Sequence, residues 1–122
     1  MIANGKVERP ALGISYIPAA QARSLGVTRG VLVLDVPAGS SAAKAGLRGS
    51  YRSASGEPVL GDVIVGVNGD TVRTDLDLFR AIDKFAPGER VTVRVQRLRP
   101  GGDRLVEDET RLSIELQAMA TT

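Results

Sequence analysis

A glycine between two large apolar residues is the first position at which this sequence could hold a ligand. Leu12, Gly13 and Ile14 follow Pro10 and Ala11 and lead into a short alternating stretch that is typical of a strand. Glycine packs nothing in a strand, but it accepts backbone dihedrals that other residues avoid and lets a ligand approach the main chain. Successive backbone N–H groups in a tight loop form a nest for an anion. The spacing alone leaves two interpretations open, an anion-binding nest and an ordinary strand start after a proline.

The residues after the glycine indicate which ligand such a nest would serve. Ile14, Ser15 and Tyr16 begin the expected strand, and an extended peptide can pair with the main chain of a strand at the edge of a sheet. The anion would then be the terminal carboxylate of that peptide. This hypothesis requires no catalytic side chain.

Other side chains that could take part in catalysis or binding have simpler structural explanations. Asp75 and Asp77 fall in the first turn of an expected helix, where carboxylates complement the helix dipole, and the acidic run at residues 107–109 borders a turn. The serines within residues 39–41 and 52–57 lack the Gly-x-Ser-x-Gly nucleophile elbow. The arginines of the C-terminal hairpin alternate with valines rather than with stacking aromatics, so they predict solvated strand faces and not nucleic-acid binding.

Composition narrows the function classes further. The chain has 122 residues, of which 43% are hydrophobic and 25% charged, and this is typical of one globular domain. It contains no histidine and no cysteine, which excludes a Ser-His-Asp or Cys-His arrangement, a disulfide and a cysteine-ligated zinc site. It has no phosphate-binding glycine motif and no apolar run near the ~20 residues of a membrane span. We therefore expect no catalytic residue, metal, cofactor, nucleic-acid partner or membrane insertion.

Apolar periodicity in the first half of the chain predicts short strands and little helix. We expect a strand over residues 11–17, a short helix or turn over 18–27, and a buried strand over the apolar run 30–36. Ser41 is expected to cap a short alanine-rich helix that ends at Gly46. The polar stretch at residues 48–60 is typical of an inserted surface loop.

The second half predicts a hairpin, one amphipathic helix and two further strands. An Asn-Gly turn at residues 68–69 follows the strand at 60–67. The helix is expected over residues 75–85, with a cap at 74–75 and with Leu78, Ile82 and Phe85 on one face. Strands at residues 89–98 and 110–116 alternate, and their inward residues are Val91, Val93, Val95, Leu112, Ile114 and Leu116. The pattern predicts a mainly β (α+β) fold, a partly open β-barrel of five to six strands capped by two helices.

Several segments, in order, resemble one known family. Their sequences are RPALGI, GVLVLDVPAGSSAAKAGL, LGDVIVGVNGDTV and DLFRAIDKFAPGERVTVRVQR. Together they resemble the PDZ domain of HtrA/Deg serine proteases over residues 9–116. The combination of Ala-Gly-Leu, Gly-Asp-Val-Ile, Val-Asn-Gly and Pro-Gly-Glu in this order is specific, whereas Leu-Gly-Ile alone is not.

The resemblance implies a PDZ-like fold with a circularly permuted, bacterial-type topology and a peptide site near the N-terminus. The loop that binds the peptide carboxylate would consist of Ala11, Leu12, Gly13 and Ile14, with Arg9 as the nearest cation. The strand that pairs with the peptide would consist of Ile14, Ser15 and Tyr16. A helix would form the other wall, with Phe79 at the pocket for the last side chain of the peptide. The residues expected to line the groove from this helix are Leu76, Phe79, Ile82 and Asp83.

The resemblance also implies a non-catalytic domain of a larger serine protease. Such a domain captures C-termini or extended segments of misfolded proteins, and it delivers them to a separate protease domain or regulates that domain. Its partners would be those segments, the protease domain and neighbouring subunits, in the bacterial periplasm or cell envelope or in the thylakoid lumen. Two alternatives stay open, an oligomer-assembly module and the PDZ domain of another membrane or processing protease.

One departure from the family pattern concerns the organisation of the chain. Most such domains run from Ala-Gly-Leu almost directly to Gly-Asp-Val-Ile, whereas this sequence inserts residues 48–60. A similar insertion is typical of Deg proteases of the chloroplast lumen and of photosynthetic and related bacteria. We expect residues 1–8 to be a linker from an upstream domain, residues 9–117 to be the PDZ domain, and residues 118–122 to be a flexible tail.

Overall fold

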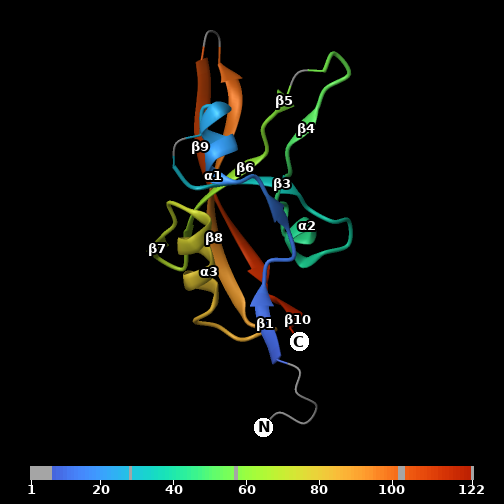
Figure 1. The fold of residues 1–122 in the computed structure, drawn as a ribbon, viewed down its shortest axis with the longest axis vertical. Coiled ribbons are helices and arrows are strands. Elements are labelled where there is room, and N and C mark those ends of the chain that lie inside the picture. The colour runs from blue at the N-terminus through green and yellow to red at the C-terminus, as the bar shows by residue number, and fades with distance from the viewer. Residues whose placement is uncertain (1–6, 28, 57, 102–103, 122) are drawn as a thin grey trace.

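The computed structural model of the chain describes residues 7–27, 29–56, 58–101 and 104–121, and Figure 1 shows their arrangement. Within these residues the polypeptide forms ten strands and three helices. In chain order they are β1 (Val7–Ala11), β2 (Ser15–Tyr16), α1 (Ala19–Ser24), β3 (Val31–Asp35), α2 (Ser41–Ala45), β4 (Tyr51–Arg52), β5 (Pro58–Val59), β6 (Asp62–Val67), β7 (Asp70–Thr71), α3 (Asp75–Ile82), β8 (Arg90–Gly101), β9 (Arg104–Glu115) and β10 (Gln117–Thr121).

The largest sheet is antiparallel and has the strand order β2-β3-β6-β8-β9, with β7 beside β6. Its inner strands β3 and β6 are apolar along most of their length, because both faces of these strands are covered. Val31, Val33 and Ile64 belong to the main core, whereas Leu32 and Val63 belong to a second cluster that includes Ala22 of α1. The apolar runs of the sequence thus correspond to strands that are buried on two sides.

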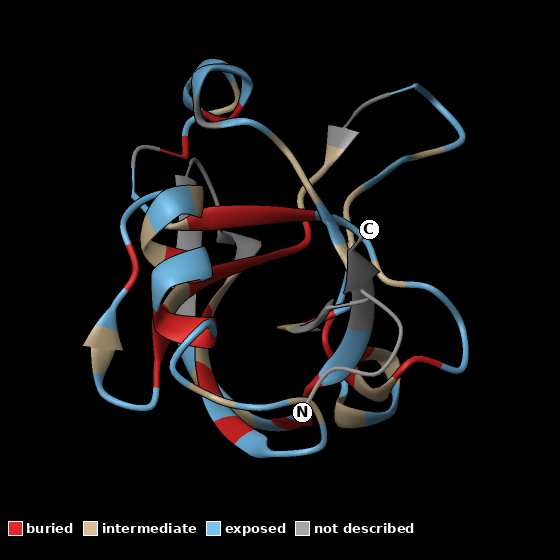
Figure 2. Ribbon diagram, turned by 60° about the horizontal axis from the view of Figure 1, so that its bottom comes forward, coloured by how far each residue is buried: buried red, intermediate tan, exposed pale blue. Residues whose placement is uncertain are grey.

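The long hairpin of β8 and β9 supplies much of the remaining core. Val91, Val93 and Val95 are buried, as the alternation predicted, and Figure 2 shows the strands curving around this interior with the exposed residues on loops and outer surfaces. The two strands pair from Arg90 opposite Glu115 to the tip of the hairpin, which is longer than expected. Residues 102–103 of the predicted Pro-Gly-Gly-Asp turn lie outside the described residues. The sheets do not close on themselves, in agreement with a partly open barrel.

Capping side chains determine where two of the helices begin. Thr74 caps α3, as predicted, and its hydroxyl accepts a hydrogen bond from a backbone N–H in the first turn. The cap of α2 is Ser40 and not Ser41, because Ser40 has the extended backbone of a cap residue and its Oγ accepts a backbone hydrogen bond three residues later. Helix α3 ends at Ile82, earlier than the predicted residue 85. None of the helices in the described part of the chain is long and apolar enough to cross a membrane.

The two ends of the described chain lie side by side. Strands β1 and β10 pair in antiparallel register, with Ala11 opposite Gln117 and Val7 opposite Thr121. Main-chain pairing places residues 7–8 of the expected linker and residues 118–121 of the expected flexible tail in strands, and the division into linker, domain and tail stays a prediction. Residues 1–6 and 122 of these segments lie outside the described residues.

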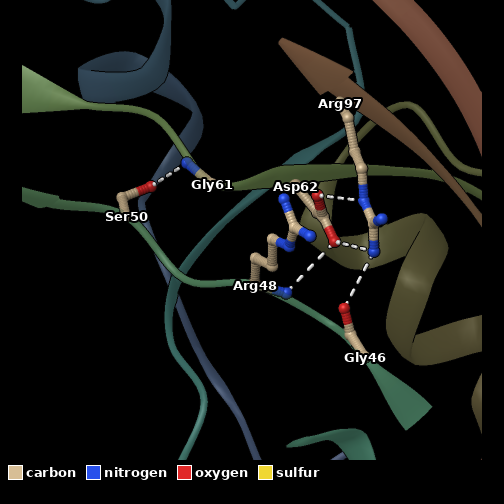
Figure 3. Close-up of polar contacts among 6 residues, drawn as sticks. All are labelled: Gly46, Arg48, Ser50, Gly61, Asp62 and Arg97. Carbon is tan, nitrogen blue, oxygen red and sulfur yellow. Dashed lines mark hydrogen bonds and ion pairs between the residues drawn. The ribbon is translucent and has the colours of Figure 1, made fainter. Parts of the chain in front are cut away.

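The insertion at residues 48–60 contains the two-stranded hairpin β4–β5, which projects from the body of the fold (Figure 1). A buried carboxylate holds the root of this hairpin. Asp62 is 1% exposed and accepts hydrogen bonds from the backbone N–H of Arg48 (3.1 Å) and from Nε of Arg97 (3.1 Å; Figure 3). Nη2 of Arg97 also donates to the carbonyl oxygen of Gly46 (2.8 Å).

A hydroxyl group joins the two ends of the insertion at the same root. Ser50 Oγ donates to the carbonyl oxygen of Val33 (2.7 Å) and accepts from the N–H of Gly61 (2.8 Å). The main chain adds a hydrogen bond from the N–H of Asp62 to the carbonyl oxygen of Arg48 (3.0 Å). The start and the end of the insertion are therefore fixed to each other and to β3.

We expect Asp62→Asn to destabilise the protein much more than a matched exposed change. The amide removes the negative charge and presents a donor to Arg97, so the free energy of unfolding should fall by about 2–3 kcal/mol, less than for a fully buried pair because Arg97 is partly exposed. Asp70 pairs with Lys84 at 2.7 Å on an exposed surface, and Asp70→Asn should cost about 0–1 kcal/mol. Urea unfolding at pH 7 measures both variants. Equal losses would show that the root of the hairpin contributes nothing special.

Candidate functional site

A groove runs between the loop that joins β1 to β2 and the helix α3. It encloses a cavity of about 250 Å³. The residues that line it are Pro10, Ala11, Leu12, Gly13, Ile14, Tyr16, Leu78, Phe79, Ile82 and Asp83. Most of these side chains are apolar, so the groove suits an apolar side chain with a polar group near the loop.

The loop between β1 and β2 has an unusual backbone at its centre. Gly13 has a φ of +73°, in the left-handed region that favours glycine. Leu12 is buried in the main core and Ile14 packs against that core, so the loop is anchored on both sides of the glycine. Within the described part of the chain, the backbone N–H groups of these three residues donate no hydrogen bond. The loop therefore offers free donors at a fixed position beside the cavity.

The last strand of the chain lies against this loop. A Cβ atom on Gly13 would overlap Oε1 of Gln117, whose residue is opposite Ala11 in the β1–β10 pair. Sequence analysis missed Gln117, and no local signal could have found it, because the contact joins two ends of the sequence. The left-handed backbone favours glycine at this position, whereas the Gln117 amide, at the end of a flexible side chain, could move aside for a larger residue.

Strand β2 forms one wall of the groove. It is at the end of the strand order of the large sheet, where it pairs with β3 through Ser15 opposite Asp35 and Tyr16 opposite Val33. No other described strand pairs with its second edge. That edge can accept the main chain of an added strand.

Helix α3 forms the other wall, and its faces are divided as the sequence predicted. Leu78 and Ile82 are buried, whereas Phe79 is 43% exposed. The ring of Phe79 meets the ring of Tyr16 edge to face, with 5.5 Å between the centroids and 65° between the planes. Burial, and then the negative charge of Asp75, raises the pKa of the Tyr16 hydroxyl above 10.0. Two aromatic side chains thus bridge the groove from opposite walls.

The predicted site residues are brought together with few exceptions. Residues 11–14, Tyr16, Phe79, Ile82 and Asp83 all line the one cavity. Ser15 belongs to β2 but does not line it, and Leu76 is 53% exposed in the first turn of α3, outside the lining. The backbone of Arg9 is in β1, and its side chain lies outside the described part of the structure. Among the described residues, no three acidic side chains gather as they would to hold a metal ion.

Sequence comparison finds relatives of two kinds. The PDZ domain family matches residues 10–117. Protease Do-like 1, chloroplastic, of Arabidopsis thaliana is 48% identical over 93 residues, which are 76% of this chain and 21% of that protein. The probable periplasmic serine endoprotease DegP-like of Brucella suis biovar 1 is 36% identical over 101 residues, which are 80% of this chain and 18% of that protein. The chain thus spans about a fifth of the length of these curated relatives.

Structural comparison finds a similar fold. The crystal structure of the HtrA3 PDZ domain bound to a phage-derived ligand has a TM-score of 0.61 and 22% sequence identity, over 95% of this chain and 92% of that one. At this identity the likeness concerns the fold alone. Taken with the relatives above, it confirms the resemblance to PDZ domains of HtrA/Deg proteases that the sequence segments indicated.

We expect substitutions on the two faces of α3 to differ in their effect on stability. Ile82→Ala removes a side chain from the main core and should lower the free energy of unfolding by about 2–5 kcal/mol. Phe79→Ala removes a partly exposed ring that contacts Tyr16, and should cost about 0.5–1.5 kcal/mol. Thermal and urea unfolding of both variants measure the difference. A larger loss for Phe79→Ala would mean that the ring belongs to the core and not to the groove.

Proposed function

Because the chain belongs to the PDZ domain family, we propose that it captures the C-termini or exposed extended segments of misfolded proteins in the groove between β2 and α3. The peptide would add to the free edge of β2 by main-chain hydrogen bonds. Its terminal carboxylate would accept hydrogen bonds from the backbone N–H groups of residues 12–14. Its last side chain would enter the apolar cavity beside Phe79.

The observation that carries this proposal is the position of the unpaired donors. Leu12, Gly13 and Ile14 line the apolar cavity, and their backbone N–H groups have no hydrogen-bond partner among the described residues. The edge of β2 that follows them has no partner strand in the same part of the chain. A terminal carboxylate followed by an apolar side chain and an extended main chain matches these features in the same order. Affinity should be modest, about micromolar, or roughly −8 kcal/mol.

The domain would serve a larger protease in which it has no catalytic part. The sequence contains no histidine and no cysteine, so a histidine-assisted serine or cysteine nucleophile is absent. The relatives are named as chloroplastic and periplasmic proteases, which supports a parent serine endopeptidase in the bacterial cell envelope or the thylakoid lumen. Captured segments would be delivered to its protease domain, or their binding would regulate that domain.

A second candidate function rests on the β4–β5 hairpin. The hairpin projects from the fold on a hydrogen-bonded root, and Tyr51 is 64% exposed on it. Such an arm suits contacts with neighbouring subunits of the parent oligomer. If assembly is its role, replacing residues 51–59 by Gly-Gly in the full-length protein should reduce the oligomer in size-exclusion chromatography, whereas Gly13→Val should leave the oligomer intact.

The glycine of the loop provides the test of peptide capture. Gly13→Val should lower the affinity for a peptide with a free C-terminal valine by at least about tenfold. A β-branched residue disfavours a positive φ, so the loop would change its conformation. Amidation of the peptide should weaken binding by about 1.5–3 kcal/mol, since it removes the charge that the N–H groups bind. The two losses should not add, because each abolishes the same interaction. Isothermal titration measures all four combinations.

Gly26→Val is the matched control for this test. Gly26 also has a positive φ, of +93°, but a Cβ atom there would meet no neighbour and the residue does not line the groove. Both valine variants should lose stability, whereas only Gly13→Val should lose peptide affinity. Unchanged affinity for the amidated peptide would refute carboxylate capture by the loop.

A further inference from the structure

The large sheet has a second concave surface, which shares no lining residue with the groove. It is a hollow of about 560 Å³ at the turn between β6 and β7 and the adjoining parts of β8 and β9. The residues that line it are Asn68, Gly69, Thr92, Arg94 and Arg111. Strand β9 is at the opposite end of the strand order from β2, so the groove and the hollow belong to different parts of the sheet.

One arginine of the hollow is packed on the main chain and incompletely paired. A Cβ atom on Gly66 would come within 2.6 Å of Cζ of Arg94, so the absence of a side chain at residue 66 gives the guanidinium its place. Nε of Arg94 is buried and has no hydrogen-bond partner within the described part of the chain. Glu109 faces it with Oε1 4.0 Å from Nη1, a distance too long for a hydrogen bond. The guanidinium is thus fixed in position, and because its side chain is 28% exposed, its terminal nitrogens and not the buried Nε are open to a ligand.

A second arginine is directly opposite the first. Arg94 and Arg111 are register partners on β8 and β9, and Arg94 stands between the buried Val93 and Val95, so its side chain is on the outer face. Like charges that face each other on neighbouring strands destabilise a sheet. An anion bound between the two guanidinium groups would turn this repulsion into attraction.

The other polar groups of the hollow add further donors. Oδ1 of Asn68 accepts a hydrogen bond from the backbone N–H of Thr92 (2.6 Å), which leaves its NH2 group for a ligand. The Thr92 side chain contributes a hydroxyl, which can also donate. Donors therefore predominate around the hollow, as in sites that bind oxyanions.

We propose that this hollow binds the carboxylates of an acidic segment of a partner protein. Each guanidinium can hold a carboxylate with two parallel hydrogen bonds, and paired residues on adjacent strands are about 5 Å apart, which suits neighbouring acidic side chains of one segment. The lining contains no aromatic ring on which a base could stack, so a nucleic acid is a poorer fit. A single small anion would fill only a small part of the volume. This interaction is independent of peptide capture in the groove.

The probe for this proposal is a tetraglutamate peptide acetylated at its N-terminus and amidated at its C-terminus, so that it has no terminal carboxylate for the groove. Titrated into the ¹⁵N-labelled protein at low salt, it should shift the backbone signals of residues 68, 69 and 92 and the Nε–H signal of Arg94. Arg111→Gln and Arg94→Gln should each weaken binding by at least about fivefold, the loss of a charge-assisted contact. Arg80→Gln, which removes an exposed arginine of α3 outside both concave surfaces, should change affinity by less than about twofold.

Three results would overturn the proposal. An equal loss for Arg80→Gln would show that the peptide responds to overall charge. If inorganic phosphate shifts the NMR signals of the hollow and tetraglutamate does not, the hollow binds a small anion and not a protein segment. Undiminished binding by Arg111→Gln, an exposed position at which the fold should tolerate the change, would exclude the arginine pair as the site. Thermal unfolding of each variant verifies that the compared proteins are folded.

Discussion

Burial of most of β3 and β6 on both faces is the constraint on which the placement of the groove depends. Leu32 and Val63 face one cluster while Val31, Val33 and Ile64 face the other, so these parts of the inner strands are covered on both faces. The strands at the two ends of the strand order of the large sheet each have an edge that pairs with no other described strand, and β2 is one of these strands. Helix α3 packs into the main core with Leu78 and Ile82, and this leaves the groove between that edge and the flank of the helix.

The loop at Gly13 is held by contacts from three directions. Leu12 enters the core, Ile14 packs against it, and Gln117 of the last strand approaches the glycine. The β1–β10 pair joins the beginning and the end of the described chain directly beside this loop. A proposed carboxylate site made of backbone N–H groups needs such fixation, because main-chain donors bind an anion well only when they already point to one place.

Local patterns predicted the features that depend on neighbours in the sequence. The alternation of Val91, Val93 and Val95 and the helix face with Leu78 and Ile82 are properties of single segments, and the structure contains them. The pairing of β10 with β1 and the role of Asp62 were missed, because each joins positions far apart in the sequence. Periodicity around a helix likewise could not show that the cavity ends before Leu76. The spacing of residues in a segment predicts its local structure, whereas the partners of buried polar groups depend on how distant segments are brought together by the fold.

The root of the β4–β5 hairpin has a consequence for how this part of the molecule can vary. Its two ends already meet through the bonds among Arg48, Ser50, Gly61 and Asp62, so the core does not depend on what lies between them. The entropy of closing a loop grows only slowly with its length. The segment between the two ends is therefore a natural place for sequence divergence, where descendants of one ancestral domain can lengthen, shorten or recompose an external arm while the groove and the core keep their geometry.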